Sequence, residues 1–325
     1  MILSMKPPYE ITTSILKLIA SISEKIGQVN AVYLVKQSPQ LRKQNRIKTI
    51  HSSLQIEGNT LTEEQITAII ENKRVLAPQK DIAEVLNALD VYDKLKTFKP
   101  HTEKSFLEAH QILMKGLVEN SGSYRKNSVG IVKGSKLAHL APPAENLSFL
   151  MKDLFNYVKN KEELTLIKAC VFHYEMEFIH PFLDGNGRMG RLWQTVILMN
   201  EYPVFEFLPI ETIISATQEN YYKALSISDK QGKSTVFIEY MLEVIDKALF
   251  ELLKFNNRIL TDNDRLDYFI SLGKKEFKRN DYMNVFKDIS SATASRDLKK
   301  GIDLNIFEKT GDKNKTIYLI NNNHK

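Results

Sequence analysis

The residue types that could carry out chemistry are concentrated in one short segment, residues 180–191, which reads His-Pro-Phe-Leu-Asp-Gly-Asn-Gly-Arg-Met-Gly-Arg. Its Gly-Asn-Gly turn separates the end of one expected helix from the start of the next. The second helix therefore presents unpaired backbone N–H groups, which together with the helix dipole form an anion site suited to phosphates. The glycines of the turn remove side chains that would block close approach to the backbone.

Charged and titratable side chains flank this turn. Arg188 and Arg191 are three residues apart, so they project from one side of the helix, and arginine makes forked contacts to phosphate oxygens. Asp184 is a lone carboxylate of the kind that holds Mg²⁺ beside a polyphosphate. His180 ends the preceding helix, where a neutral imidazole could take a proton from an attacking hydroxyl. Each residue alone has an ordinary structural explanation, but together they predict nucleotide transfer.

Two helices must position this segment. Apolar residues recur at helical spacing through residues 163–179, and Pro181 ends this helix because the residue before a proline leaves the α region. The second helix starts at about Arg188. Further helices are expected at 11–28, 63–71, 81–96, 103–119, 145–158, 211–228 and 234–256. Between 121 and 143, three glycines, the β-like stretch Val129–Val132 and Pro142-Pro143 predict a small hairpin or ordered loop.

The composition limits the class of protein. The chain has 325 residues, of which 43% are hydrophobic and 26% charged, which excludes wholesale disorder. One cysteine, Cys170, excludes an intramolecular disulfide and a cysteine-based metal centre and fits a reducing cytosol. We find neither a signal-peptide core nor a membrane span and therefore expect a cytoplasmic protein. The net charge of +6 mildly suggests anionic partners, although a solvated lysine-rich surface is the commoner explanation.

The C-terminal residues form a separate pattern after a polar stretch at 257–264, which we interpret as a linker. Helices are expected at 264–272, 281–287 and 291–300 and strands at Ile306–Lys309 and Thr316–Ile320, the outline of a winged helix. Ser291 is expected to be the N-cap of the last helix. Residues that could face DNA are Thr293, Ser295, Arg296, Lys299 and Lys300, with Lys313 and Lys315 at the wing tip. Residues 261–325 hold 13 Lys and Arg against 10 Asp and Glu, a net charge of only +3, which favours protein docking or structural support over DNA binding.

The segment at 180–191 resembles the motif of the Fic family, H-P-F-x-D/E-G-N-G-R-x-x-R, and meets every specified position. The resemblance extends over about residues 10–255. It implies a mainly α fold: an all-helical Fic core at 101–256 with a small β-hairpin flap, preceded by an N-terminal helical region at 1–100. Residues 257–325 would form the winged-helix-like domain.

The resemblance also implies how the motif would transfer AMP from ATP to a protein hydroxyl. His180 would be the base that activates a Ser, Thr or Tyr of the target, Asp184 would bind Mg²⁺ on the α- and β-phosphates, and Phe182 would anchor the loop in the core. Phosphate contacts would come from the anion hole and both arginines: Gly185, Asn186, Gly187, Arg188 and Arg191. Arg191 would hold the γ-phosphate and so orient the α-phosphate for in-line attack.

A second stretch, Ser53–Gly58, resembles the family's inhibitory motif S/T-x-x-x-E-G/N and is called the inhibitory segment below. It precedes the catalytic motif, as in the subclass with an N-terminal inhibitory helix. By resemblance, Glu57 would pair with Arg191 and leave the γ-phosphate without its arginine, so that ATP binds in a non-productive pose. The residues also fit an ordinary helix end, with Glu57 in the last turn and Gly58 at the C′ position, and both interpretations can hold together.

Two more regions are similar to parts of the family's site. The extended stretch Gly130–Lys136 lies where the family has a flap that clamps the target protein by main-chain pairing, with Lys133 and Gly134 beside the nucleotide. A plain surface hairpin is the alternative. Tyr221-Tyr222 occupies the place of a tyrosine pair near the nucleoside, although two tyrosines in an amphipathic helix are more often core. Asp229 would be a polar residue on the adenine side.

Other residues with chemical potential have simpler explanations. His173 lies seven residues before His180, but no Cys or further His completes a metal pair, so we expect a packed structural histidine. Trp193 is expected in the core, and Cys170 is given no catalytic role.

The sequence therefore predicts an autoinhibited protein adenylyltransferase that uses ATP and Mg²⁺ and modifies a hydroxyl-bearing target protein, itself included. The main alternative is a DNA-binding regulator whose Fic-like core only senses nucleotide. His180 favours the enzyme, because a sensor needs the anion hole and the arginines but no base. Use of another donor, removal of AMP and a homodimer also stay open.

Overall fold

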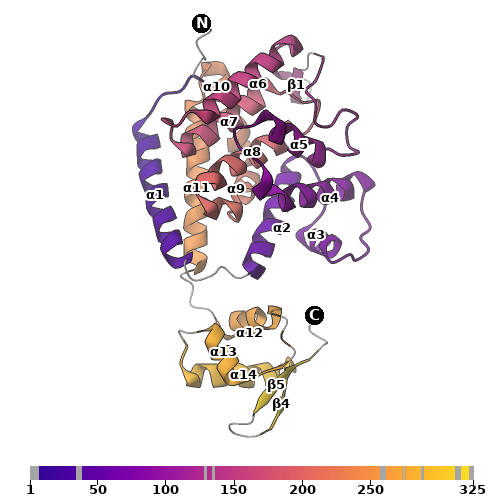
Figure 1. Ribbon diagram of the computed structural model, residues 1–325, viewed down its shortest axis with the longest axis vertical. Helices are drawn as coiled ribbons and strands as arrows, with labels where there is room; N and C mark the ends of the chain where they lie inside the picture. Colours follow the sequence, from indigo (N-terminus) through magenta and orange to yellow (C-terminus); the bar gives the residue numbers. More distant parts are fainter. Residues whose placement is uncertain are drawn as a thin grey trace. The chain divides into compact units, whose positions relative to one another are not determined.

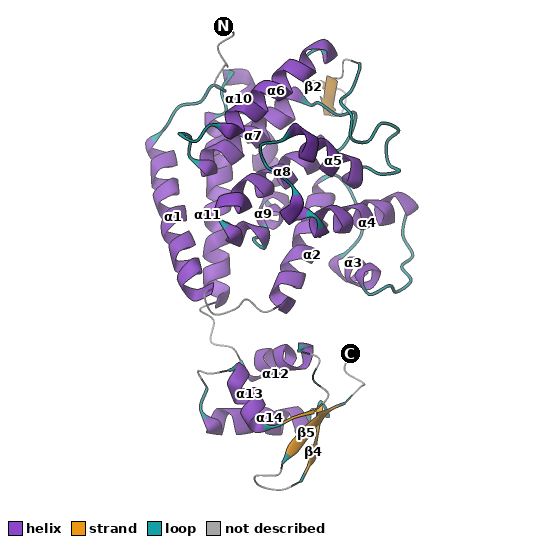
Figure 2. Ribbon diagram, in the orientation of Figure 1, coloured by secondary structure: helices purple, strands orange, loops and turns teal. Residues whose placement is uncertain are grey.

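The computed structural model describes residues 7–33, 39–127, 130–133, 136–256, 261–272, 274, 276–286, 289–311 and 316–321. They belong to two compact units, Met1–Lys254 and Phe255–Lys325, which Figure 1 colours along the chain. The expected mainly α fold is confirmed, because helices predominate in the described residues of both units (Figure 2). The described strands form a two-stranded hairpin in the first unit and a three-stranded sheet in the second.

The first unit is built from helices around a single large hydrophobic core. Its helices are α1 (Thr13–Tyr33), α2 (Pro39–Ile56), α3 (Glu63–Ile70), α4 (Gln79–Asp93), α5 (Glu103–Leu113), α6 (Leu147–Lys159), α7 (Thr165–Ile179), α8 (Asn186–Glu201), α9 (Ile210–Ala216), α10 (Gln218–Gln231) and α11 (Thr235–Asn256). Short 3₁₀ turns are η1 (Leu95–Thr97), η2 (Ala144–Asn146) and η3 (Pro203–Glu206). The hairpin consists of β1 (Gly130–Lys133) and β2 (Lys136–Leu140).

Helices α7 and α8 lie side by side at the centre of this unit (Figure 1). Both bury side chains around their whole circumference, which is typical of a helix enclosed by others. Trp193 of α8 is fully buried, packs edge-to-face on Phe106 of α5 with ring centroids 5.1 Å apart, and donates to the carbonyl of Pro100. The turn that joins α7 to α8 is therefore held on a rigid base.

Helix α2 lacks the regular spacing of apolar residues that predicts the other helices from the sequence. It buries Ile47, Ile50 and Leu54, but polar residues between them are buried as well, among them Asn45, Thr49, Ser52 and Ser53. These polar residues bond to neighbouring helices, as Asn45 does to the carbonyl of Phe207. Helix α2 packs on α4, α8 and α9, and its C-terminal end therefore reaches the α7–α8 turn.

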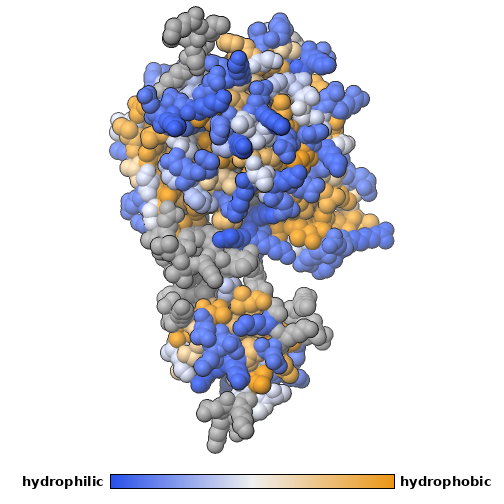
Figure 3. All heavy atoms as spheres, in the orientation of Figure 1, coloured by the Kyte–Doolittle hydropathy of each residue, from blue (hydrophilic) through white to orange (hydrophobic). Residues whose placement is uncertain are grey.

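The surface of the first unit is largely hydrophilic, with an apolar area over α3 and α4 (Figure 3). Leu76 and Leu86 are 81% and 47% exposed in this region. Among the described residues, the search for a helix with the length and apolar character of a membrane span finds none.

The second unit has the element order of a winged helix. Its elements are α12 (Asp262–Ser271), β3 (Glu276–Phe277), α13 (Arg279–Val285), α14 (Ser291–Asp303), β4 (Phe307–Thr310) and β5 (Ile317–Ile320). The sheet order is β3-β5-β4, with both pairs antiparallel. A separate core of aromatic and aliphatic residues includes Phe269, Phe277, Leu298 and Phe307.

Two details of this unit differ from the sequence-based expectation. The N-cap of α14 is Ser290, whose hydroxyl accepts from the Thr293 N–H, so the prediction of Ser291 is wrong by one residue. The edge strand β3 was not expected, because two residues carry no alternation to detect. Lys313 and Lys315 of the expected wing tip lie outside the described residues.

Candidate active site

The α7–α8 turn is fixed by its own side chains and by two left-handed residues. His180 caps α7 with φ = 49°, and Gly185 starts α8 with φ = 86°. The left-handed backbone favours glycine at Gly185, and a Cβ there would also lie 2.7 Å from the sulfur of Met114, whose side chain would have to shift. Asn186 closes the turn, because its side chain donates to the Phe182 carbonyl and accepts from the Phe182 N–H, both at 2.9 Å.

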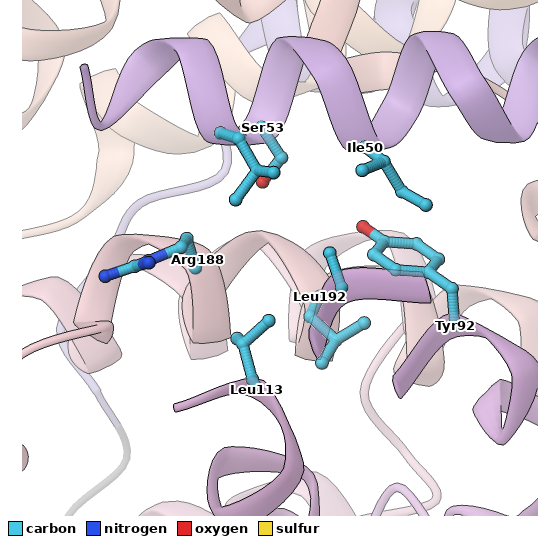
Figure 4. A pocket seen from close by; sticks show the side chains of 8 residues that line it. Ile50, Ser53, Tyr92, Leu113, Arg188 and Leu192 are labelled. Atoms are coloured by element: carbon cyan, nitrogen blue, oxygen red, sulfur yellow. The ribbon is translucent and has the colours of Figure 1, made fainter. Parts of the chain in front are cut away.

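A cavity of about 980 Å³ opens at the N-terminus of α8, a size typical of small-ligand sites. It brings together most of the residues singled out from the sequence: Glu57, His180, Asp184, Gly185, Asn186, Gly187, Arg191, Tyr221, Tyr222 and Asp229. Ser53 and Arg188 instead line a small gap between α2, α4, α5 and α8 (Figure 4). The anion cradle, the carboxylate and the imidazole thus share one cavity.

Arg191 is held by the inhibitory segment. Its Nη2 donates to Glu57 Oε1 at 2.7 Å and to the Ser53 carbonyl at 2.9 Å, and its Nε donates to Ser53 Oγ at 3.1 Å. Burial disfavours the charge of Arg191, but the Glu57 carboxylate more than offsets this and raises the pKa of the guanidinium above its ordinary value. The pairing of Glu57 with Arg191 that the resemblance implied is present in the structure.

One nitrogen of Arg191 is left for a ligand. Its Nη1 is buried, and no hydrogen-bond acceptor reaches it among the described residues. Gly187 lies directly beside it: a Cβ there would be 2.5 Å from Glu57 Oε1 and 3.2 Å from Arg191 Nη1. A buried, unsatisfied cationic donor at a helix N-terminus is costly unless an anion takes its hydrogen bond.

Asp184 and Arg188 form a unit that differs from the expectation. Arg188 was expected to contact phosphates, but it is buried and donates to Glu84 of α4 and to Asp184 Oδ1, both at 3.0 Å. The Gly185 N–H also donates to Oδ1 of Asp184, at 2.6 Å. Arg188 therefore orients the carboxylate and does not line the cavity.

The Asp184 carboxylate fits a Mg²⁺ ion that takes its other ligands from phosphates and water. The side chain is 48% exposed and lines the cavity, and the hydrogen bonds described for it go to Oδ1. The described residues contain no group of three or more His, Cys, Asp or Glu placed to hold a metal by themselves. A single carboxylate beside a phosphate site is the usual protein contribution to bound Mg²⁺.

The backbone around His180 is held by Arg125, which the sequence did not single out. This buried guanidinium donates to the carbonyls of His180, Asn127 and Pro142 at 2.8, 2.8 and 2.6 Å, and to that of Ile179 at 3.3 Å. Burial lowers the pKa of Arg125. One side chain thus ties the end of α7 to the chain that leads into and out of the hairpin.

Phe182 and His110 support the turn from below. Phe182 is fully buried, as expected, and its ring stacks on His110 of α5 with centroids 3.5 Å apart. His110 Nδ1 accepts from the Gly122 N–H at 2.8 Å, so Nε2 carries the proton and donates to the Asp184 carbonyl at 3.1 Å. Burial lowers the pKa of His110 to about 4, which keeps the ring neutral.

Of the two adjacent tyrosines, Tyr221 is buried in the core and Tyr222 lines the cavity. Tyr221 is 1% exposed and bonds to His173 and Glu177 of α7, so the His173 ring is packed as expected. Tyr222 is half-buried and lines the cavity. Asp229 accepts from the Tyr174 hydroxyl at 3.0 Å. Burial raises the pKa of the Cys170 thiol, which makes the nucleophilic thiolate harder to form.

The structure has an antiparallel hairpin where the flap was expected. Strands β1 and β2 pair Gly130 with Leu140 and Lys133 with Lys136, with an irregularity between Ile131 and Val132. Lys133 therefore lies at the hairpin end of β1. Gly134 falls outside the described residues, so its expected place beside the nucleotide stays a prediction.

Sequence reasoning missed four residues that support the site: Glu84, His110, Arg125 and Glu177. Glu84 stands at helical spacing with the buried Ala88 and Val91, and a carboxylate at a core position is a usable signal of a buried partner. Arg125 gives no such signal, because its acceptors are backbone carbonyls up to 55 residues away.

The first unit is a mainly helical fold whose candidate site opens at the N-terminus of the central helix α8. Residues 100–198 match the Fic/DOC family. A solved Fic family protein from Desulfovibrio desulfuricans G20 is 40% identical and aligns over 99% of this chain and 100% of its own, with a TM-score of 0.77. Fic-1 of C. elegans, 20% identical over 74% of this chain and 72% of its own, shares the fold with a TM-score of 0.62.

The chain therefore belongs to the Fic family. A curated relative, the protein adenylyltransferase Fic of Drosophila yakuba, is 30% identical over 222 residues, which are 64% of this chain. The match covers 42% of that protein, so this chain spans less than half the length of the relative.

Proposed function

We propose that this protein is an autoinhibited protein adenylyltransferase that transfers AMP from ATP to a hydroxyl group of a target protein. The observation that carries the proposal is Arg191: Nη1 lies beside Gly187 and has no partner among the described residues, while Nε and Nη2 are taken by Ser53 and Glu57. One guanidinium thus serves both the nucleotide site and the inhibitory segment. The name of the Drosophila relatives supports the reaction type.

In the proposed reaction the target hydroxyl attacks the α-phosphorus, the bond to the β-phosphate oxygen breaks, and pyrophosphate leaves. His180 would take the hydroxyl proton, since Arg125 and the left-handed cap fix its backbone at the cavity. Arg191 would hold the γ-phosphate, and Asp184, oriented by Arg188, would hold Mg²⁺. Bound Mg²⁺ would neutralise part of the phosphate charge. The β1–β2 hairpin would receive the target by main-chain pairing.

The test compares the intact masses of three proteins after incubation with ATP and Mg²⁺: wild type, Glu57→Gly, and Glu57→Gly combined with His180→Ala. We expect added AMP in Glu57→Gly, little in wild type and none in the double variant. Equal labelling of the single and double variants would remove His180 as the base. No labelling in any protein, with ATP binding shown by calorimetry, would favour the nucleotide sensor.

The second unit supports a further candidate function, nucleic-acid binding. The exposed side chains of α14 include Ser291, Ser295, Arg296 and Lys299, and the exposed acidic residue Asp303 lies only at the C-terminal end of the helix. Small polar residues and cations on one helix face suit a DNA groove. A gel shift with mixed-sequence DNA across a salt series would show tight binding with a steep salt slope if this candidate holds.

A further inference from the structure

Four side chains form a hydrogen-bonded chain that ends at the wall of the cavity. Gln194 Oε1 of α8 lies 2.5 Å from His173 Nδ1, and His173 Nε2 lies 3.0 Å from the Tyr221 hydroxyl of α10. The Tyr221 hydroxyl in turn lies 3.1 Å from Glu177 Oε1 of α7. Glu177 lines the cavity beside Arg191 and Glu57, whereas Gln194, at the other end of this row of hydrogen bonds, is buried in the core.

The number of protons in this chain follows from its donors and acceptors. The Gln194 carbonyl only accepts, so His173 Nδ1 must donate to it. If the His173 ring is neutral, its Nε2 accepts a hydrogen bond from the Tyr221 hydroxyl. The tyrosine oxygen can then only accept a hydrogen bond from Glu177, and the Glu177 carboxyl must be protonated to donate it. If Tyr221 donates to an ionised Glu177 instead, His173 must carry two protons. With the Gln194 nitrogen turned toward Cys170 and its carbonyl toward the ring, either arrangement holds one proton more than a neutral histidine with a carboxylate provides.

Burial decides where this proton lies. His173 is fully buried, and burial lowers its pKa to about 3, which excludes an imidazolium near neutral pH. The Glu177 side chain is 15% exposed, and burial raises its pKa to about 7, with a further rise from the Glu57 charge and a partial offset by Arg191. The proton therefore belongs on the carboxyl group.

We propose that Glu177 is protonated in the folded protein and forms a neutral wall of the triphosphate site, so that loss of this proton weakens the binding of ATP. The inference rests on the proposed function, since it takes the cavity beside Arg191 as the place of the phosphates. An ionised Glu177 would compete with the γ-phosphate for Arg191 and repel its charge. Glu177 is thus a positioning residue, which keeps Arg191 available without itself touching the reacting atoms.

The charged and titratable groups that face Glu177 come from the elements packed around it. Glu57 follows α2, Arg191 lies on α8, and Tyr221 and Asp229 lie on α10. Removal of Glu57 lowers the negative charge near Glu177, and arrival of the γ-phosphate restores it. The neutral form is therefore favoured both with the inhibitory segment in place and with ATP in place.

The test measures the Kd for ATP by calorimetry with Mg²⁺ from about pH 6 to pH 8.5. The background is Glu57→Gly, so that the inhibitory segment does not interfere. We expect a constant Kd at low pH and a rise of up to tenfold per pH unit once Glu177 ionises. Adding Glu177→Gln, which keeps the shape and the donor but cannot ionise, should abolish the rise and hold the Kd at its low-pH value.

Glu175→Gln is the matched control in the same background. Burial also raises the pKa of Glu175 to about 7, but this carboxyl does not line the cavity, so the rise of the Kd with pH should persist. A pH-independent Kd that is equal with and without Glu177→Gln would overturn the inference and leave the proposed function standing. Absence of ATP binding at every pH would overturn both.

An infrared difference spectrum between pH 6 and pH 8 measures the protonation of the Glu177 carboxyl group in the absence of nucleotide. The carboxylic acid band lost on raising the pH should be smaller in Glu177→Gln than in its parent. An unchanged band would place the proton elsewhere and overturn the assignment, whatever the binding data show.

Discussion

Replacing Glu57 by Gln separates the charge of the inhibitory segment from its bulk. Glu57 Oε1 accepts from Arg191 Nη2 at 2.7 Å, and the two side chains are 29% and 1% exposed. A charge-assisted hydrogen bond in such surroundings contributes about 1.5–3 kcal/mol. At about 1.4 kcal/mol per factor of ten, its loss should shift the balance toward the released inhibitory segment by roughly 10- to 150-fold.

Ser53→Ala should shift the balance toward the released inhibitory segment by a smaller factor. It removes the hydroxyl that accepts from Arg191 Nε at 3.1 Å but keeps the Ser53 carbonyl bond at 2.9 Å. The loss of one such bond is worth about 1 kcal/mol, or roughly a fivefold shift. We therefore expect transfer rates in the order wild type, Ser53→Ala, Glu57→Gln.

The assay is the initial rate of AMP incorporation at saturating ATP and Mg²⁺. Gln55→Ala is the matched control, because Gln55 lies on the same turn of α2 but bonds to Ser215, and its rate should equal that of wild type. If Glu57→Gln is as slow as wild type while Glu57→Gly is fast, the bulk of the side chain at position 57 inhibits transfer and its charge does not. Equal rates in all variants would refute inhibition by this segment.

Three further changes test the support of the site. Asp184→Asn should raise the Mg²⁺ concentration needed for half-maximal transfer at least tenfold, and an unaltered titration would contradict the ligand assignment. Arg125→Lys should lower the free energy of unfolding by about 3 kcal/mol or more, read from urea midpoints, because lysine cannot reach four carbonyls at once. Burial raises the pKa of Glu211 to about 7, above its ordinary 4.5, so this carboxyl costs stability as the pH rises through that window, by up to about 3 kcal/mol. Glu211→Gln should therefore raise Tm by several degrees at pH 8 and little at pH 4.5, whereas the exposed Glu243→Gln should change neither.

The chemistry of the site could be predicted because it is local. The proline after His180, the glycines of the turn and the arginines one helical turn apart each act through backbone geometry that a few residues determine. The pairing of Glu57 with Arg191 joins residues 134 apart, and it was reached only through the resemblance to a family motif. No spacing rule would have found it.

The supporting residues could not be predicted, because their partners are distant in sequence or belong to the backbone. Arg188 was assigned to phosphates on its type, yet Glu84, 104 residues earlier, takes its charge. Only the end of helix α2, at Glu57 and Gly58, was anticipated, because the rest of the helix buries hydroxyls and amides where an amphipathic pattern would place apolar side chains. On the proposed function, a polar buried face suits the release of the inhibitory segment, since its hydrogen bonds can be exchanged for bonds to water or to a ligand.

Arg191 explains why inhibition and nucleotide binding are coupled on the proposed function. Its side chain is 1% exposed, and a buried guanidinium without an anion costs about 3–5 kcal/mol. Departure of Glu57 into an empty cavity would incur that cost in full, whereas a γ-phosphate arriving at Nη1 can take over the charge as Glu57 leaves. AMP has no phosphate in this position and cannot make the exchange. On the proposed function, release of the inhibitory segment therefore costs less with a triphosphate in the cavity than without one, and a neutral Glu177 keeps a second carboxylate from taking the place of the phosphate.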